Sequence, residues 1–282
     1  MRQALVLARV TALDILGQPL TLIVWAVTAL LLLLATVLPS FTFEPEGDLK
    51  FMTDVGLATV ALGLLAVGLW PAATLLADEV TQRTALTLLA KPLSRGSYLL
   101  GRYLGILAAL ATSAVLLGGC FLVAVQLTEG QVLSAQIDRF SDASSGAEAF
   151  PDAPRALPGI RWGLAGGVLL GLAQAGMLCA LALAFSCVLP SAPATLGCCG
   201  GLFFSGHLLG ALAASASGWT GILVHGARVL LPCLDLFDLS EAVATGARIP
   251  MGYVGACLLY AAAYAAAVLL VAVPLFERRE LT

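Results

Sequence analysis

The residues best suited to act as a nucleophile and a base lie in one hydrophobic stretch, at Ser205 and His207. A serine and a histidine within hydrogen-bonding reach are the basis of acyl-transfer hydrolysis. On a helix, however, residues two positions apart point about 200° apart, so these two side chains cannot share a hydrogen bond. We therefore expect no catalytic residues here, and an intramembrane hydrolase is kept only as an alternative function.

The chain also lacks the motifs that usually bind nucleotide phosphates or metal ions. The chain contains no G-x-x-x-x-G-K-[ST] motif, and its only lysines are Lys50 and Lys91, so it cannot build the loop that cradles nucleotide phosphates. It contains no H-E-x-x-H motif, and its seven cysteines show no C-x-x-C spacing. We expect no metal and no cofactor on this chain, and any ATP hydrolysis that serves it must belong to another polypeptide.

One long polar stretch separates two hydrophobic ones: DEVTQRTALTLLAKPLSRGSYLLGRYLG, residues 78–105. Between residues 83 and 91, polar and apolar side chains fall on opposite sides of a helical wheel, which predicts a short helix on a membrane surface or against a partner. Pro92 ends this helix, because the residue before a proline is pushed out of the α region. Ser94 or Ser97 can cap the next helix, which enters the membrane. A stiff surface helix between two spans is suited to transmit force.

Four features of this segment carry a family resemblance. They are an acidic residue at the end of the preceding span, a Thr-x-x-x-Leu-Leu helix, a Pro-x-Ser-Arg turn, and Gly-[Lys/Arg]-x-x-Gly at the start of the next span. The matching residues are Glu79, Thr84 with Leu88 and Leu89, Pro92-Leu93-Ser94-Arg95, and Gly101-Arg102 with Gly105. The segment thereby resembles the cytoplasmic coupling segment of ABC transporter permeases of the type-2 exporter class, a class related to the nitrous oxide reductase maturation permeases. Where that family usually has Gly-Thr, this chain has Arg83-Thr84.

The resemblance implies that residues 78–97 dock a separate ABC ATPase subunit. Glu79, Thr84 and Arg95 are the contacts we consider most important. The full set of expected coupling residues is Glu79, Arg83, Thr84, Leu88, Leu89, Lys91, Pro92, Ser94 and Arg95. The resemblance also implies a second permease copy, as a homodimer or a heterodimer.

Composition independently indicates a membrane protein. Hydrophobic residues make up 60% of the 282-residue chain and charged residues 11%, against about 45–50% and about 25% in soluble domains. We predict an all-α integral membrane domain of six spans, with no sizeable soluble domain. The predicted spans are residues 20–38, 55–77, 98–125, 162–189, 194–217 and 251–276. Only Arg102 is charged within any of them, and we expect it to snorkel to the membrane border.

Charge predicts the orientation. The side that carries both termini, the coupling segment and the 190–193 turn has eight basic residues against five acidic ones, a net charge of +3. The other side has six against twelve, a net charge of −6. The positive-inside rule therefore places both termini in the cytoplasm, in a bacterial inner membrane. The overall charge of −3, without a basic tract, makes nucleic acid an unsuitable partner.

Three segments outside the spans have expected forms. Residues 1–18 are either the interfacial elbow helix that the resemblance implies or an ordinary positively charged lead-in. Residues 127–160, rich in Ala, Ser, Asp and Pro, are predicted to be mostly irregular and extracytoplasmic. Residues 218–250 are predicted to form an outer surface layer with short helices, or a re-entrant loop.

Two further sets of residues inside the predicted spans are polar residues at mid-depth and regularly spaced glycines. Gln174 and His207 lie near the middle of the fourth and fifth spans, where a polar group is costly, so they line a translocation pathway or join helices by hydrogen bonds. Five glycines form G-x-x-x-G stripes that allow close helix packing; these are Gly163, Gly167 and Gly171, and Gly197 and Gly201. Packing within the chain is the first interpretation of both stripes, and a dimer seam is the second.

The function that follows is an exporter permease that couples ATP hydrolysis on another subunit to transport. A non-transporting membrane assembly or maturation factor is a further alternative, beside the hydrolase. The lack of a buried carboxylate disfavours a cation-coupled carrier, whereas hydrophobic or lipid-like cargo suits the apolar spans. The substrate is not defined by the sequence.

Overall fold

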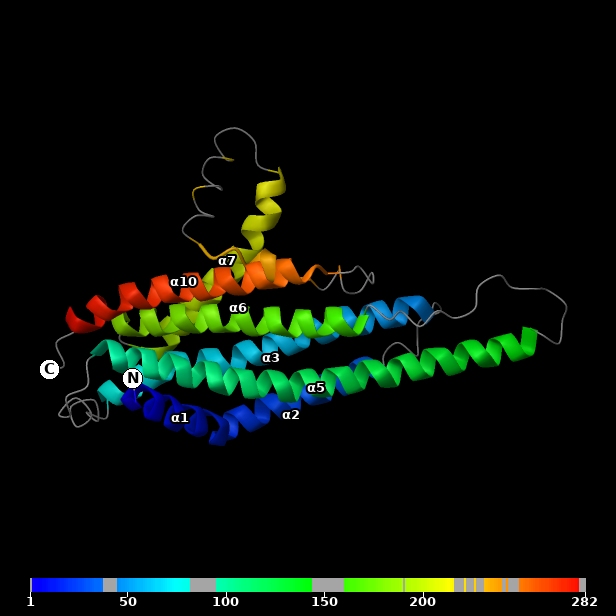
Figure 1. Cartoon of the computed structure of the whole chain (residues 1–282), viewed down its shortest axis with the longest axis horizontal. Helices are drawn as coiled ribbons and strands as arrows, with labels where there is room; N and C mark the ends of the chain where they lie inside the picture. The colour runs from blue at the N-terminus through cyan, green and yellow to red at the C-terminus, as the bar shows by residue number, and fades with distance from the viewer. Residues whose placement is uncertain are drawn as a thin grey trace.

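The chain folds into a bundle of long α-helices in the computed structural model (Figure 1). The structure describes residues 2–37, 45–81, 95–143, 160–189, 191–215, 231–239 and 249–278, with the single residues 221, 226 and 242. Within this part of the chain the elements are α1 (Arg2–Gly17), α2 (Pro19–Val37), α3 (Pro45–Thr81), α5 (Arg95–Ala143), α6 (Ile160–Val188), α7 (Ala192–Ser215), the 3-10 helix η2 (Leu234–Phe237) and α10 (Met251–Arg278). No strand occurs among the described residues.

Five of these helices are long and apolar enough to cross a membrane, which indicates a multi-pass membrane protein. Their apolar stretches are Pro19–Val37, Phe51–Leu75, Gly96–Gln131, Gly163–Val188 and Met251–Phe276. They correspond to five of the six predicted spans. The remaining predicted span, 194–217, coincides largely with α7, which is not among these five helices. The six-span count therefore stays a prediction.

Helices α3 and α6 both run antiparallel to α5. The facing pairs are Gly63 with Leu117 and Gly68 with Leu110 for α3, and Val168 with Gly118 and Gly176 with Leu107 for α6. Because a later residue of α3 or α6 faces an earlier residue of α5 in each case, the end of α3 lies beside the start of α5.

Helix α10 runs parallel to α6, since Val254 approaches Gly166 at the starts of both helices. Helix α6 therefore ends at the opposite end of the bundle from the start of α10. The chain must return between these ends, and α7 lies in the returning stretch. Figure 1 shows the last turns of α7 projecting away from the other long helices.

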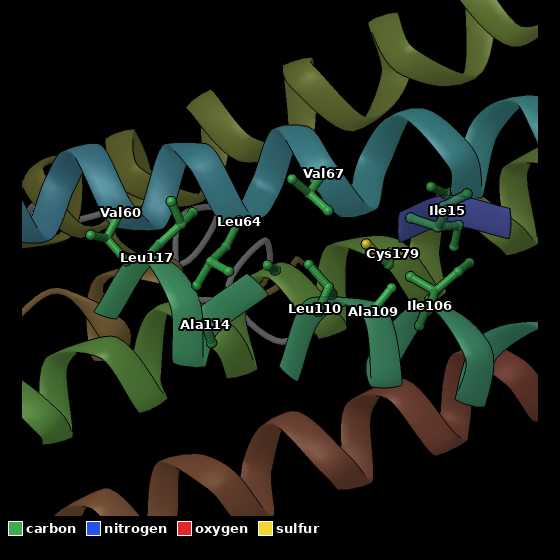
Figure 2. Close-up of a cluster of buried hydrophobic side chains, with 14 of the residues drawn as sticks. Ile15, Val60, Leu64, Val67, Ile106, Ala109, Leu110, Ala114, Leu117 and Cys179 are labelled. Atoms are coloured by element: carbon green, nitrogen blue, oxygen red, sulfur yellow. The ribbon is translucent and has the colours of Figure 1, made fainter. Parts of the chain in front are cut away.

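The core lies mainly between α3, α5 and α6. Figure 2 shows Leu64, Leu110 and Leu117 between α3 and α5, and all three side chains are fully buried. Further along α5, Ile106 lies next to Ile15 of α1. Fully burying such a side chain is worth about 1.5–3 kcal/mol relative to water, although inside a bilayer close packing supplies more of the stabilisation than water exclusion. This contact makes α3 and α5 the central pair of the bundle.

The prediction for residues 127–160 is wrong in its first half, because α5 continues as a helix to Ala143. The extension adds about 25 Å beyond the predicted span, at about 1.5 Å per residue. Helix propagation is cooperative, and residues 127–143 contain no proline to end it, whereas the prolines of this loop are Pro151, Pro154 and Pro158. The average composition of residues 127–160 does not show that only the second half contains proline. Helix α3 likewise begins at Pro45, ten residues before the predicted span, with proline in the first turn, where it is well tolerated.

Candidate functional site at the base of the coupling segment

The candidate site is the end of the bundle from which the polar coupling segment emerges. Residues 82–94 lie outside the described residues, so the predicted helix at 83–91 stays a prediction, as do the places of Arg83, Thr84, Leu88, Leu89, Lys91, Pro92 and Ser94. The described helices bracket the segment. Glu79 falls in the last turn of α3, and Arg95 is the first residue of α5.

Helices α1, α3, α5 and α10 lie together at this end, where α6 also ends. Tyr98 of α5 stacks on Phe276 of α10, with ring centroids 5.9 Å apart and planes inclined by 10°. A Cβ built on Gly96 would contact Val273 of α10 at 3.7 Å. One built on Gly101 would lie 3.0 Å from the carbonyl oxygen of Ala4 in α1. The beginning of α1 and the end of α10 therefore lie beside the base of the coupling segment, together with the end of α3.

Helix α1 packs lengthwise along the start of α5 and runs in the same direction. Its buried face has helical spacing and mostly small residues: Ala4, Ala8, Thr11, Ala12 and Ile15. Opposite them, a Cβ on Gly105 would lie 2.7 Å from the carbonyl oxygen of Ala8 and 2.6 Å from the Cβ of Thr11. Only glycine allows the two backbones to come so close. The two glycines of the Gly101-Arg102-x-x-Gly105 motif therefore form the seat for α1.

Arg102 lies between these glycines and points into the contact rather than toward the membrane border. Its side chain is 7% exposed, so the expectation that it snorkels is wrong. The Nη1 group donates a hydrogen bond of 3.0 Å to Oγ1 of Thr11, a fully buried residue of α1. Close packing by the flanking glycines draws α1 over the guanidinium and removes its path to water.

Further contacts of Arg102 come from both helices. Nε donates to the hydroxyl of Tyr98 at 3.4 Å, and the guanidinium carbon lies 5.5 Å from the centre of the Tyr98 ring. Such a cation over an aromatic face is attracted by the ring quadrupole. Asp14, an exposed residue of α1 one turn beyond Thr11, carries the opposite charge without a direct ion pair to the guanidinium being defined. Arg102 thus takes a hydroxyl and a counter-charge from α1 and an aromatic face from its own helix.

The polar residues predicted near the membrane midplane lie apart from this site. His207 is half-buried, with Nδ1 3.0 Å from the carbonyl oxygen of Phe203 and its ring 4.7 Å from the Phe203 ring. Ser205 donates to the carbonyl oxygen of Leu202 at 3.1 Å. Each of these side chains is therefore bonded to its own helix. Gln174 is half-buried.

The two glycine stripes have different surroundings. On α6, a Cβ at Gly167 would lie 2.7 Å from Leu57 and one at Gly171 would lie 3.4 Å from Ala61, both in α3. Gly163, at the start of this stripe, is buried. On α7, Gly197 and Gly201 are exposed and have no other atom near their Cβ positions. The first stripe is a packing seam within the chain, and the second faces outward.

Sequence reasoning identified Arg102 but missed its partners on α1. Thr11 lies 91 residues away in the chain, and a threonine in an alanine-rich lead-in carries no distinctive motif. One signal was present: Ala4, Ala8 and Ala12 repeat every four residues, the same spacing as Gly101 and Gly105. Two small-residue stripes of equal period are typical of closely packed helices.

Comparison with known proteins leaves the family of the chain open. No protein-family model and no curated protein matches it.

Proposed function

We propose that this chain is the permease subunit of an ABC transporter of the type-2 exporter class. It acts as a dimer in a bacterial inner membrane, with both termini in the cytoplasm, and couples ATP hydrolysis on a separate subunit to export. The chain itself supplies no catalytic residue. Its lack of a phosphate-binding loop requires that the nucleotide chemistry be done by its partner.

One observation carries the proposal. The segment with the family-like motif joins α3 to α5 at the end of the bundle where α1 and α10 also meet, through Gly101 with Ala4 and Tyr98 with Phe276. A force applied there would reach four helices over a short distance. A polar surface segment that only linked two spans would not need such an arrangement.

The mechanism follows from this geometry. When the ATPase pair closes, it displaces the coupling segment, through contacts that we assign chiefly to Glu79, Thr84 and Arg95. Helices α3 and α5 share a closely packed face, with Gly63 and Gly68 against Leu117 and Leu110. They therefore transmit the displacement as a pair, since packed interiors shift between discrete arrangements and do not deform continuously. The spans then alternate their opening between the two sides of the membrane.

The outward faces of the described spans bear on the cargo class. They carry many large apolar side chains, among them Ile23, Val115 and Leu259. A hydrophobic or lipid-like cargo is compatible with such faces, whereas an aqueous pore would require more polar residues. Gln174 and His207 are the polar groups available at mid-depth. Membrane lipid is in either case a direct neighbour of the outer helices.

Purification tests the proposal. The chain solubilised from its native membrane is expected to bring down a polypeptide with a P-loop, identified by mass spectrometry. The isolated chain, stripped of partners, is expected to bind no ATP in equilibrium dialysis. Stoichiometric nucleotide binding by the isolated chain would contradict the proposal. The hydrolase alternative gains no support from Ser205 and His207, which bond to separate carbonyl groups of their own helix.

A further inference from the structure

We infer that Arg102 is a positioning residue that fastens α1 to α5, so that α1 moves with the base of the coupling segment as one body. The contact between Arg102 and α1 lies within one chain and does not depend on the proposed function. Its role in transport does rest on the proposed function. In the proposed transporter, α1 would thereby move together with the segment that docks the ATPase.

The fastening depends on groups supplied by α1. Thr11 accepts the 3.0 Å hydrogen bond from Nη1, and Asp14 provides the opposite charge. Tyr98, which contributes the aromatic face, belongs to α5 and would stay with Arg102 if α1 moved away. Separation of the helices would thus take this acceptor away from a guanidinium that is largely buried. Removing the partner of a buried charge is strongly unfavourable, so the two helices stay together.

Helix α1 is held in the bundle by one face only, which carries Ala4, Ala8, Thr11, Ala12 and Ile15. It packs chiefly on α5, and its opposite face presents Leu5, Val6, Val10 and Leu13, all exposed. These side chains suit contact with lipid but provide no attachment to another described helix. The Arg102 contact is the polar part of this single α1–α5 interface.

A displacement of α1 would also move α2. The two helices meet at Gly17 and Gln18, where Thr21 donates a buried hydrogen bond of 2.6 Å across the junction to the carbonyl oxygen of Ile15. This bond stiffens the joint between them. A displacement of α5 would consequently travel through Arg102 and Thr11 into α1, and through Thr21 into α2. The first span would then be driven by the same input as α3 and α5.

Hydrogen exchange of the full-length chain in lipid nanodiscs, read by mass spectrometry over residues 4–17, tests the fastening. We expect Thr11→Val to accelerate exchange of the α1 amides by about tenfold or more, as the loss of one hydrogen bond to a charged group implies. Thr11→Ser keeps the hydroxyl and should stay close to the wild type. The matched control is Thr112→Val, an exposed threonine of α5 that bonds to the carbonyl oxygen of Ala108 in its own helix. It should leave α1 unchanged.

A double-mutant cycle separates fastening from general damage to packing. Arg102→Gln should accelerate α1 exchange, and adding Thr11→Val to it should cause no further acceleration, because both changes remove the same bond. Arg9→Gln, on the exposed side of α1, should have no effect. If Arg102→Gln does not fold, the comparison of Thr11→Val with Thr11→Ser and Thr112→Val still decides the question.

Equal α1 exchange in Thr11→Val and Thr112→Val, or fully additive effects in the cycle, would overturn the inference. The measurement needs no ATPase. A chain that captures no ATPase but shows the expected exchange pattern would contradict the proposed function and leave the fastening intact.

Discussion

Tyr98, one turn into α5, stacks almost parallel on Phe276, near the end of α10, with ring centroids 5.9 Å apart. The coupling segment emerges just before Tyr98, so this stack ties its base to the last helix of the chain. Phe276 is 5% exposed, so its ring is almost wholly enclosed at this contact. The stability of the bundle end should therefore depend on it.

Truncation of Phe276 tests this dependence. Phe276→Ala should lower the free energy of unfolding by about 3–5 kcal/mol, the usual cost of removing a buried aromatic ring. The midpoint of a reversible SDS titration in mixed micelles measures the change. Phe204→Ala on α7, where the ring is 74% exposed, is the matched control and should change the midpoint little. Equal shifts for the two variants would mean that the stack contributes nothing specific.

The seat for α1 gives a second prediction. Gly105→Ala should destabilise the chain by about 1–3 kcal/mol, as expected for overpacking, because its new Cβ would lie 2.7 Å from the carbonyl oxygen of Ala8. Gly119→Ala lies on the same helix with open space around it. It should be neutral or stabilising by up to about 1 kcal/mol, since alanine is the better helix former. The same titration compares them, and a Gly105→Ala protein as stable as Gly119→Ala would argue against the close approach of α1.

Orientation in the membrane is a third prediction. A cysteine at Ser144, beyond the end of α5, should react with an impermeant maleimide added outside intact cells. A cysteine at Ser94, in the coupling segment, should react only after the cells are opened. Both positions are tested in chains whose native exposed cysteines, Cys120 and Cys198, have been replaced by alanine. The reverse labelling pattern would place the coupling segment outside the cell and remove the basis for ATPase docking.

Much of the fold follows from hydropathy and length, and the errors occur where another factor decides. The apolar stretch at 251–276 could be predicted because about 20 apolar residues in a row have few other structures open to them. The extension of α5 to Ala143 could not be predicted in the same way. The average composition of residues 127–160 combines a first half without proline and a second half that contains three prolines. The boundary depends on helix propagation, which a composition average does not represent.

The candidate site was only partly predictable. Gly101, Arg102 and Gly105 stand out as a motif, but the motif does not say what they face. The environment of Arg102 depends on Thr11 and on the close approach of two backbones, and such long-range contacts leave no local pattern. Snorkelling was therefore the natural expectation for a lone arginine near a helix start, and the packing of α1 overrode it.

The central claim is that an ATPase docks on the coupling segment, and Arg95 provides its most direct test. Arg95→Glu should leave folding intact, within about ±0.5 kcal/mol, as for an ordinary surface substitution. It should weaken capture of the ATPase, because losing a charge-assisted interface contact typically costs about 2–5 kcal/mol. That cost corresponds to roughly thirty-fold to several-thousand-fold in affinity.

Arg155→Glu, in the loop predicted to lie on the other side of the membrane, is the matched control and should capture the ATPase as the wild type does. The deciding measurement is quantitative pull-down of the ATPase by the wild type and the two variants at equal amounts of folded chain. Strong loss of the ATPase is expected with Arg95→Glu alone. Equal recovery of the ATPase by Arg95→Glu and Arg155→Glu would contradict docking through this segment.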